Sequence, residues 1–238
     1  MPSSDQRLAD AFVALAQVLD HPFDPSAFLT VLAEHSAELL DIHSAGAVFA
    51  IGSPDSPCAS GSDPRIAVLE SEAARAQEGP GHDCRQNGNR VEAALDAPAR
   101  VRWPAYTPRA RELGFTRVAA LPLRVRDVSF GALVLLRTTD SPPAQDTLAL
   151  GQSLADAAAL ALLRRHELEE SRILTAQLER ALTSRIIIEQ AKGVLTAQRK
   201  VTPDEAFILL RTYARKNRSK LHEVALAVVE ARLDISTP

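Results

Sequence analysis

The spacing of apolar positions along the chain changes near Pro143, and the change predicts two structural regions. Before it, short apolar runs over residues 44–52, 115–125 and 130–138 end at glycine, proline or polar positions, which is typical of β-strands. Residues 126–129, between the last two runs, have the length of a hairpin connection. These two runs are almost wholly apolar, so we expect their sheet to be covered on at least part of both faces.

Helical periodicity surrounds these strands. The first forty residues predict two amphipathic helices separated by the sequence HPFDPS, and residues 65–77 predict another. Gly79, Pro80 and Gly81 predict a turn after it. From 144 to 198 the chain has no proline and its leucines recur at helical spacing, which predicts one long helix or two in tandem.

The last fifty residues predict three short helices that share one core. TPDE at 202–205 is a capping box with proline in the first helical position, and Ser219 is a second expected cap. The predicted fold class is α+β: an α/β sandwich with an antiparallel sheet, a long helix, and a C-terminal three-helix bundle. In the long helix, a leucine stripe favours a dimeric coiled coil over a solvated linker; its members are Leu174, Leu178 and Leu182.

Length, composition and charge fit two globular domains with different partners. The chain has 238 residues, 46% of them apolar and 24% charged. No apolar run reaches the roughly 18 residues that span a bilayer, and the start lacks a secretion signal. We therefore expect a cytoplasmic protein with no membrane partner. The net charge is −3, but residues 185–220 carry +6 and the remainder −9, which predicts a polyanion partner for one part only.

The residues that could carry catalysis are few. The chain contains no phosphate-binding loop, no GxSxG sequence and no HExxH sequence. His82 and Cys84 could touch a metal ion, but they lack a second cluster of ligands. Cys58 and Cys84 are either free thiols or a redox switch. We expect no enzyme, no metal site and no cofactor.

Basic residues of the last segment lie off its apolar stripes and can project together. This holds for Lys192, Arg199, Arg211, Arg215 and Arg218. Gly193 lies in mid-helix, where it costs up to about 1 kcal/mol relative to alanine. Beside Ala191 it leaves bare backbone next to Lys192, through which a nucleotide could approach; tight packing of another helix is the alternative explanation.

Residues 184–231 resemble an ANTAR domain through the motifs IEQAKGVL, DEAF..LR..A and L.EVA..VV. The resemblance implies a three-helix module of bacterial antiterminators, which bind paired RNA hairpins in message leaders. The family's most characteristic positions here are Ala191, Lys192, Gly193 and Arg211, which we predict to bind RNA. Charge and placement add Arg185, Arg215 and Arg218.

The first 165 residues resemble a GAF domain, through EGPGHDC, RWPAYTPRARELGFTRVAALPLRV and FGALVLLR. This implies sensing of a small molecule or of redox state by a ligand site whose residues are unknown. Many relatives have cysteine in place of Gly81, whereas here Cys84 follows three residues later. No tetrapyrrole attachment site is recognisable. The predicted domains are a sensor over 1–143 whose last helix continues to about 165, a coiled-coil linker over 166–184, and the RNA-binding domain over 185–238.

These features together predict a signal-responsive, homodimeric, RNA-binding antitermination regulator. A DNA-binding regulator is the first alternative, since a basic three-helix bundle could be a helix-turn-helix. Against it, the last helix has Lys220, His222 and Glu223 at its start and becomes acidic at Glu230 and Asp234. The second alternative is a redox enzyme in the GAF-like part, such as a sulfoxide reductase that uses both cysteines.

Overall fold

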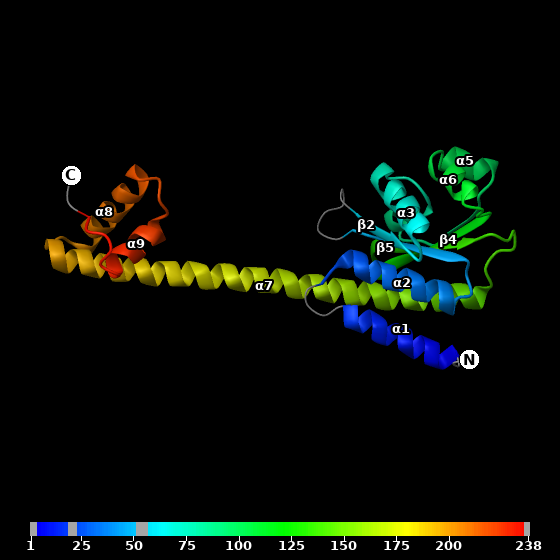
Figure 1. Ribbon diagram of the computed structural model, residues 1–238, viewed down its shortest axis with the longest axis horizontal. Helices are drawn as coiled ribbons and strands as arrows, with labels where there is room; N and C mark the ends of the chain where they lie inside the picture. The colour runs from blue at the N-terminus through cyan, green and yellow to red at the C-terminus, as the bar shows by residue number, and fades with distance from the viewer. Residues whose placement is uncertain (1–3, 19–22, 51–56, 236–238) are drawn as a thin grey trace. The chain divides into compact units, whose positions relative to one another are not determined.

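The computed structural model describes residues 4–18, 23–50 and 57–235 (Figure 1). The internal contacts of the chain divide it into two units, Met1–Glu167 and Leu168–Pro238. Each unit has a hydrophobic core of its own. One helix, α7 (Gln145–Arg199), belongs to both units, because it runs without a break across the boundary between them.

A five-stranded antiparallel sheet in the order β2-β1-β5-β4-β3 forms the centre of the first unit. The two long strands β4 and β5 form a hairpin across Arg126 and Asp127, and Arg126 has a φ of 56°, as a tight hairpin turn requires. The strands are β1 (Ser44–Phe49), β2 (Cys58–Gly61), β3 (Val91–Ala94), β4 (Arg117–Val125) and β5 (Val128–Arg137).

Helices cover both faces of this sheet, as the apolar runs predicted. The first part of α7 and α2 (Pro25–Leu39) pack on one face (Figure 1). The helix α1 (Ser4–Val18) contacts α2. The other face is covered by four short helices: α3 (Pro64–Ala76), α4 (Pro80–Asn87), α5 (Ala97–Arg102) and α6 (Tyr106–Glu112).

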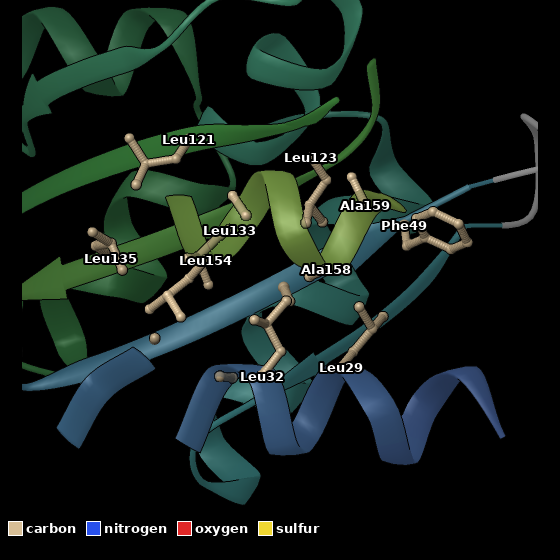
Figure 2. Packing of buried hydrophobic residues seen from close by; sticks show 14 of the residues in the cluster. Leu29, Leu32, Phe49, Leu121, Leu123, Leu133, Leu135, Leu154, Ala158 and Ala159 are labelled. Carbon is tan, nitrogen blue, oxygen red and sulfur yellow. The ribbon is translucent and has the colours of Figure 1, made fainter. Parts of the chain in front are cut away.

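Alternating side chains of the central strands divide the core into two clusters. In β5, Leu133 and Leu135 point toward α2 and α7, whereas Val134 and Leu136 point toward the short helices. Figure 2 shows the first cluster, in which Leu133 and Leu135 lie near Leu154 of α7. Because successive side chains of a strand point to opposite faces, a continuous apolar strand supplies apolar side chains to both faces of the sheet.

The second unit is a three-helix bundle, as predicted. The end of α7 packs against α8 (Pro203–Lys216) and α9 (Leu221–Val229) through a buried core that includes Ala191, Leu195 and Leu210. The predicted capping box is present: the Glu205 N–H donates to Thr202 Oγ1 at 3.3 Å, and the Thr202 N–H donates to Glu205 Oε2 at 2.8 Å.

Several local predictions were wrong. Gly79, Pro80 and Gly81 do not form a simple turn: Gly79, with a φ of 105°, is the N-cap of α4, and Pro80 begins the helix, where its missing N–H costs nothing. The cap of α9 is Lys220 instead of Ser219, and its N–H donates to Glu223 Oε2 at 3.4 Å. By contrast, the helix expected over 144–198, as one or as two in tandem, is present as the single helix α7.

Candidate nucleic-acid interface

Four arginines predicted to bind RNA are exposed on the outside of the bundle. Arg185 lies on α7, Arg211 and Arg215 lie one turn apart on α8, and Arg218 lies in the turn before α9. Within the described residues, none of the four side chains takes part in a hydrogen bond or an ion pair. Their guanidinium groups are therefore free for phosphate oxygens or base edges, which Arg binds in a bidentate way.

Lys192 differs from these arginines because it already has a partner. Its side chain is only 17% exposed, and Nζ donates to both carboxylate oxygens of Glu189, at 3.0 and 2.8 Å. The Glu189 side chain is 58% exposed, so its end of the ion pair is open to solvent. A phosphate group can therefore compete with Glu189 for Lys192.

Gly193 faces open space. A Cβ atom built there meets no atom within 4 Å outside the local helix, so tight packing of another helix within the described part of this chain does not explain the glycine. Ala191 is fully buried in the bundle core. Its methyl group packs internally and is not exposed to a ligand.

The candidate interface residues lie on α7, on α8 and in the turn before α9, and these elements share one core. Arg185 and Lys192 are seven residues apart, which places them on one side of α7 about 10 Å apart along its axis. Arg211 and Arg215 share one side of α8. The structure gives no contact between Lys192 and Arg211. Arg199, another cation noted in the sequence, is bound to the Asp234 carboxylate and is not free in the same way.

A groove beside the bundle was not predicted from the sequence. It has a volume of about 750 Å³ between α7 and the start of α9, and its lining includes Arg180, Ser184, Ile187 and His222. No motif marks these residues, because the groove is formed by pairing α7 with a helix that starts 34 positions after Ile187. Arg180 and His222 give this groove polar side chains, and the groove lies in the same unit as the exposed arginines.

The two cysteines lie on opposite faces of the sheet. Cys58 of β2 packs against the cluster under α2 and α7, whereas Cys84 of α4 is buried in the cluster under the short helices. A bond between them would require the sheet to open. Burial, with the Asp24 charge, raises the pKa of Cys58, and burial raises the pKa of Cys84 to about 12. Both thiols are therefore poor nucleophiles at neutral pH.

His82 and possible metal-binding groups can also be located in the described chain. Burial and the charge of Arg85 lower the pKa of His82, which favours the neutral imidazole. Residues 4–18, 23–50 and 57–235 contain no group of three or more histidine, cysteine or acidic side chains placed to hold a metal ion. Over the same ranges, no helix combines the length and the apolar character needed to cross a bilayer.

Comparisons with known proteins agree with this division of the chain. The family model for the GAF domain matches residues 24–162, and the model for the ANTAR domain matches residues 176–229. No curated protein matches the chain.

Among solved structures, the GAF domain of a Coxiella burnetii phosphoenolpyruvate-protein phosphotransferase is 13% identical, with a TM-score of 0.50, and the match covers 71% of this chain and 99% of that one. The corresponding Acinetobacter domain is 12% identical, with a TM-score of 0.48 and the same coverage. At such identities the likeness concerns the fold alone. The chain belongs to the GAF domain family, and it joins this sensor domain to a C-terminal ANTAR RNA-binding domain.

Proposed function

We propose that this protein is a signal-responsive antitermination regulator, in which the ANTAR domain binds paired RNA hairpins in the leaders of messages. The observation that carries the proposal is the set of exposed arginines without internal partners, together with the open backbone at Gly193. The GAF domain receives the signal. Such a protein acts in the cytoplasm, where nascent messages are found, and it needs no catalytic group.

In this proposal the interface residues have different tasks. Arg185, Arg215 and Arg218 supply charge along the phosphate backbone, and Arg211 reads a base or a loop phosphate. Lys192 exchanges its bond to Glu189 for one to a phosphate. Gly193 lets a nucleotide approach the helix backbone, and Ala191, although buried, keeps that part of α7 close to the core.

RNA and DNA binding can be separated by titration of the full chain. We expect a fluorescent RNA with two hairpins to bind more tightly than a duplex DNA of the same sequence. The affinity should fall as the salt concentration rises, because lysine and arginine side chains that contact the phosphates release counterions from the RNA. Equal or tighter binding of the duplex DNA would favour the DNA-binding alternative. Sequencing of RNA that co-purifies with the protein then identifies the target.

We also propose that the protein is a homodimer that pairs through exposed leucines of α7. Three leucines of the helix are exposed although they are apolar: Leu174 by 56%, and Leu178 and Leu182 by 62% each. Because each of these side chains is already partly covered, burial of the exposed remainder by a second copy is worth about 1 to 2 kcal/mol each. A dimer also presents two ANTAR domains to two hairpins.

Light scattering tests this assembly. The native chain should have the mass of a dimer at micromolar concentration, and the double variant Leu178→Asp, Leu182→Asp should have the mass of a monomer. Ile208→Asp is a matched control, because Ile208 is 61% exposed on α8, away from the leucine stripe. A monomer mass for the native chain, with and without RNA, would exclude this dimer.

A further inference from the structure

One carboxyl group is buried in the GAF domain, where an apolar side chain would be expected. Glu70 of α3 is only 2% exposed and lies on the buried side of its helix, with Ile66, Leu69 and Ala74. The space for it comes from Gly46 of β1. A Cβ atom at Gly46 would lie 2.4 Å from the Glu70 Cγ atom, so only glycine leaves room for this side chain.

The Glu70 carboxyl has one hydrogen-bond partner among the described residues. The Tyr106 hydroxyl of α6 donates to Glu70 Oε1 at 2.9 Å, and Tyr106 is itself 3% exposed. Glu70 also lines a narrow cavity of about 10 Å³ beside α4. This is close to the smallest space that holds one water molecule, so the site has no room for a metabolite as it stands.

Among the residues that the structure describes, no cationic side chain forms an ion pair with the Glu70 carboxylate. Around it, α4 carries His82, Asp83 and Arg85. Asp83 is bound to Arg102, and Arg85 lines the same cavity as Glu70 without an ion pair to it. Glu78 precedes α4, and Arg109 of α6 lies near Glu72 and Glu112, at 3.9 and 3.4 Å. The neighbouring strand β1 contributes no charged residue.

Burial consequently raises the pKa of Glu70 from 4.5 to about 7, against the smaller opposite effect of the Tyr106 hydrogen bond.

We propose that the Glu70–Tyr106 pair is a proton-binding site, and that its proton determines how tightly α3 packs on α6. With the proton bound, the carboxyl is neutral and its burial is tolerated. When the proton leaves to solvent, an uncompensated charge remains with a single hydrogen bond, which favours entry of water or withdrawal of the side chain. The inference goes beyond the proposed function, because it names a proton as one input of the sensor domain.

The segment that Glu70 holds has two other attachments, so the change is local. Glu78 Oε1 accepts hydrogen bonds from the backbone N–H groups of Ala105 and Tyr106, at 2.7 and 2.9 Å. Asp83 Oδ2 accepts from the indole N–H of Trp103 at 3.0 Å. Loss of the Glu70 bond therefore loosens one end of α6 and leaves the segment anchored.

The direction of the pH effect follows from the two pKa values of Glu70. The group is more basic in the folded state, at about 7, than at its ordinary value of 4.5. The stability that it contributes is thus fully present below pH 4.5 and is lost as the pH rises toward 7. Within this window the equilibrium constant for unfolding increases up to about tenfold per pH unit through this group alone.

Trp103 provides a local reporter. It is the only tryptophan of the chain, it is 1% exposed, and its ring lies 6.3 Å from the Tyr106 ring. In the full-length protein without RNA, we expect tryptophan fluorescence to titrate with a midpoint near pH 7. Glu70→Gln, which keeps the size and polarity of the side chain, should abolish this transition and the associated pH dependence of stability.

Three further variants make the test specific. Tyr106→Phe should move the midpoint above that of the native protein, because it removes the bond that lowers the pKa of Glu70. Glu72→Gln on the exposed side of α3 and His82→Asn should both leave the transition in place. A transition that persists in Glu70→Gln, or that disappears in His82→Asn, would overturn the proposal. If Glu70→Gln does not fold, an unchanged midpoint in Tyr106→Phe would overturn it instead. None of these results depends on RNA binding.

Discussion

Replacing Arg211 by alanine is expected to weaken binding of a paired-hairpin RNA by on the order of 1–3 kcal/mol, or roughly five- to 150-fold, while the bundle stays folded. The loss is large because the guanidinium is exposed and has no internal partner among the described residues, so its binding capacity is available to RNA. Preference for the loop sequence should relax as well. Fluorescence titration measures the affinity, and circular dichroism verifies folding.

Two variants on α7 complete this experiment. Lys192→Ala should lower the affinity less, and it should reduce the slope of the salt dependence by about one charge. Gly193→Ala should stabilise the helix by up to about 1 kcal/mol, since no atom of the described residues outside the local helix obstructs the added methyl group. The same methyl group should weaken RNA binding, because it covers the open backbone. A gain in stability with a loss in affinity cannot be explained by misfolding.

Arg232→Ala is the matched control for these variants. It removes one positive charge from the same unit, but Arg232 is paired with Glu230 and lies outside the proposed interface. Its RNA affinity should stay close to that of the native protein. Unchanged affinity in both Lys192→Ala and Arg211→Ala would refute this assignment of the interface. Melting of Arg211→Ala would show that this arginine is structural.

Replacing Leu133 by alanine should destabilise the GAF domain by about 2–5 kcal/mol. Leu133 has no exposed surface and lies in the central strand β5, in the cluster that joins the sheet to α2 and α7 (Figure 2). The variant loses buried apolar surface. It also leaves a cavity between the sheet, α2 and α7, whose side chains are held by their own packing. The melting temperature of this domain should fall by roughly 5 to 20 °C, measured by calorimetry.

Leu160→Ala separates this core effect from the general cost of losing a leucine. Leu160 lies on α7 but is 48% exposed, so its truncation should cost well below the value at Leu133. Because the bundle has its own core, the native chain is expected to keep a separate transition for the second unit. Equal effects of the two substitutions would show that the sheet core is not where the domain derives its stability.

The elements that could be predicted from the sequence are those with long, uniform patterns. Strands β1, β4 and β5 were found because their apolar runs are continuous, and α7 because leucines recur over 55 residues without proline. The strands β2 and β3 were missed. Each has only four residues with mostly small side chains, CASG and VEAA, which carry no clear period of two. Their positions depend on pairing with β1 and β4.

The surroundings of a candidate site residue could be predicted where they depend on the spacing of residues within one helix. Ala191 stands four residues before Leu195 on the apolar stripe, so its burial could be predicted, and an RNA contact through its methyl group conflicts with that position. The pair of Lys192 and Glu189 follows from a spacing of three on a helix. The pair of Arg199 and Asp234 spans 35 positions and depends on the tertiary fold. Glu70 did leave a local signal, as a carboxyl on the apolar stripe of α3.

The exposed apolar side chains of α7 limit how two copies can pair. Leu174, Leu178, Leu182 and Ile186 follow one another every four residues and are each at least 50% exposed. Since an α-helix has 3.6 residues per turn, this row rotates about 40° around the axis at each step. Rows of this spacing interlock when helices cross at about −50°, whereas extended left-handed winding requires a mean spacing of 3.5. Two copies that meet on this row therefore cross at one point and diverge on either side of it.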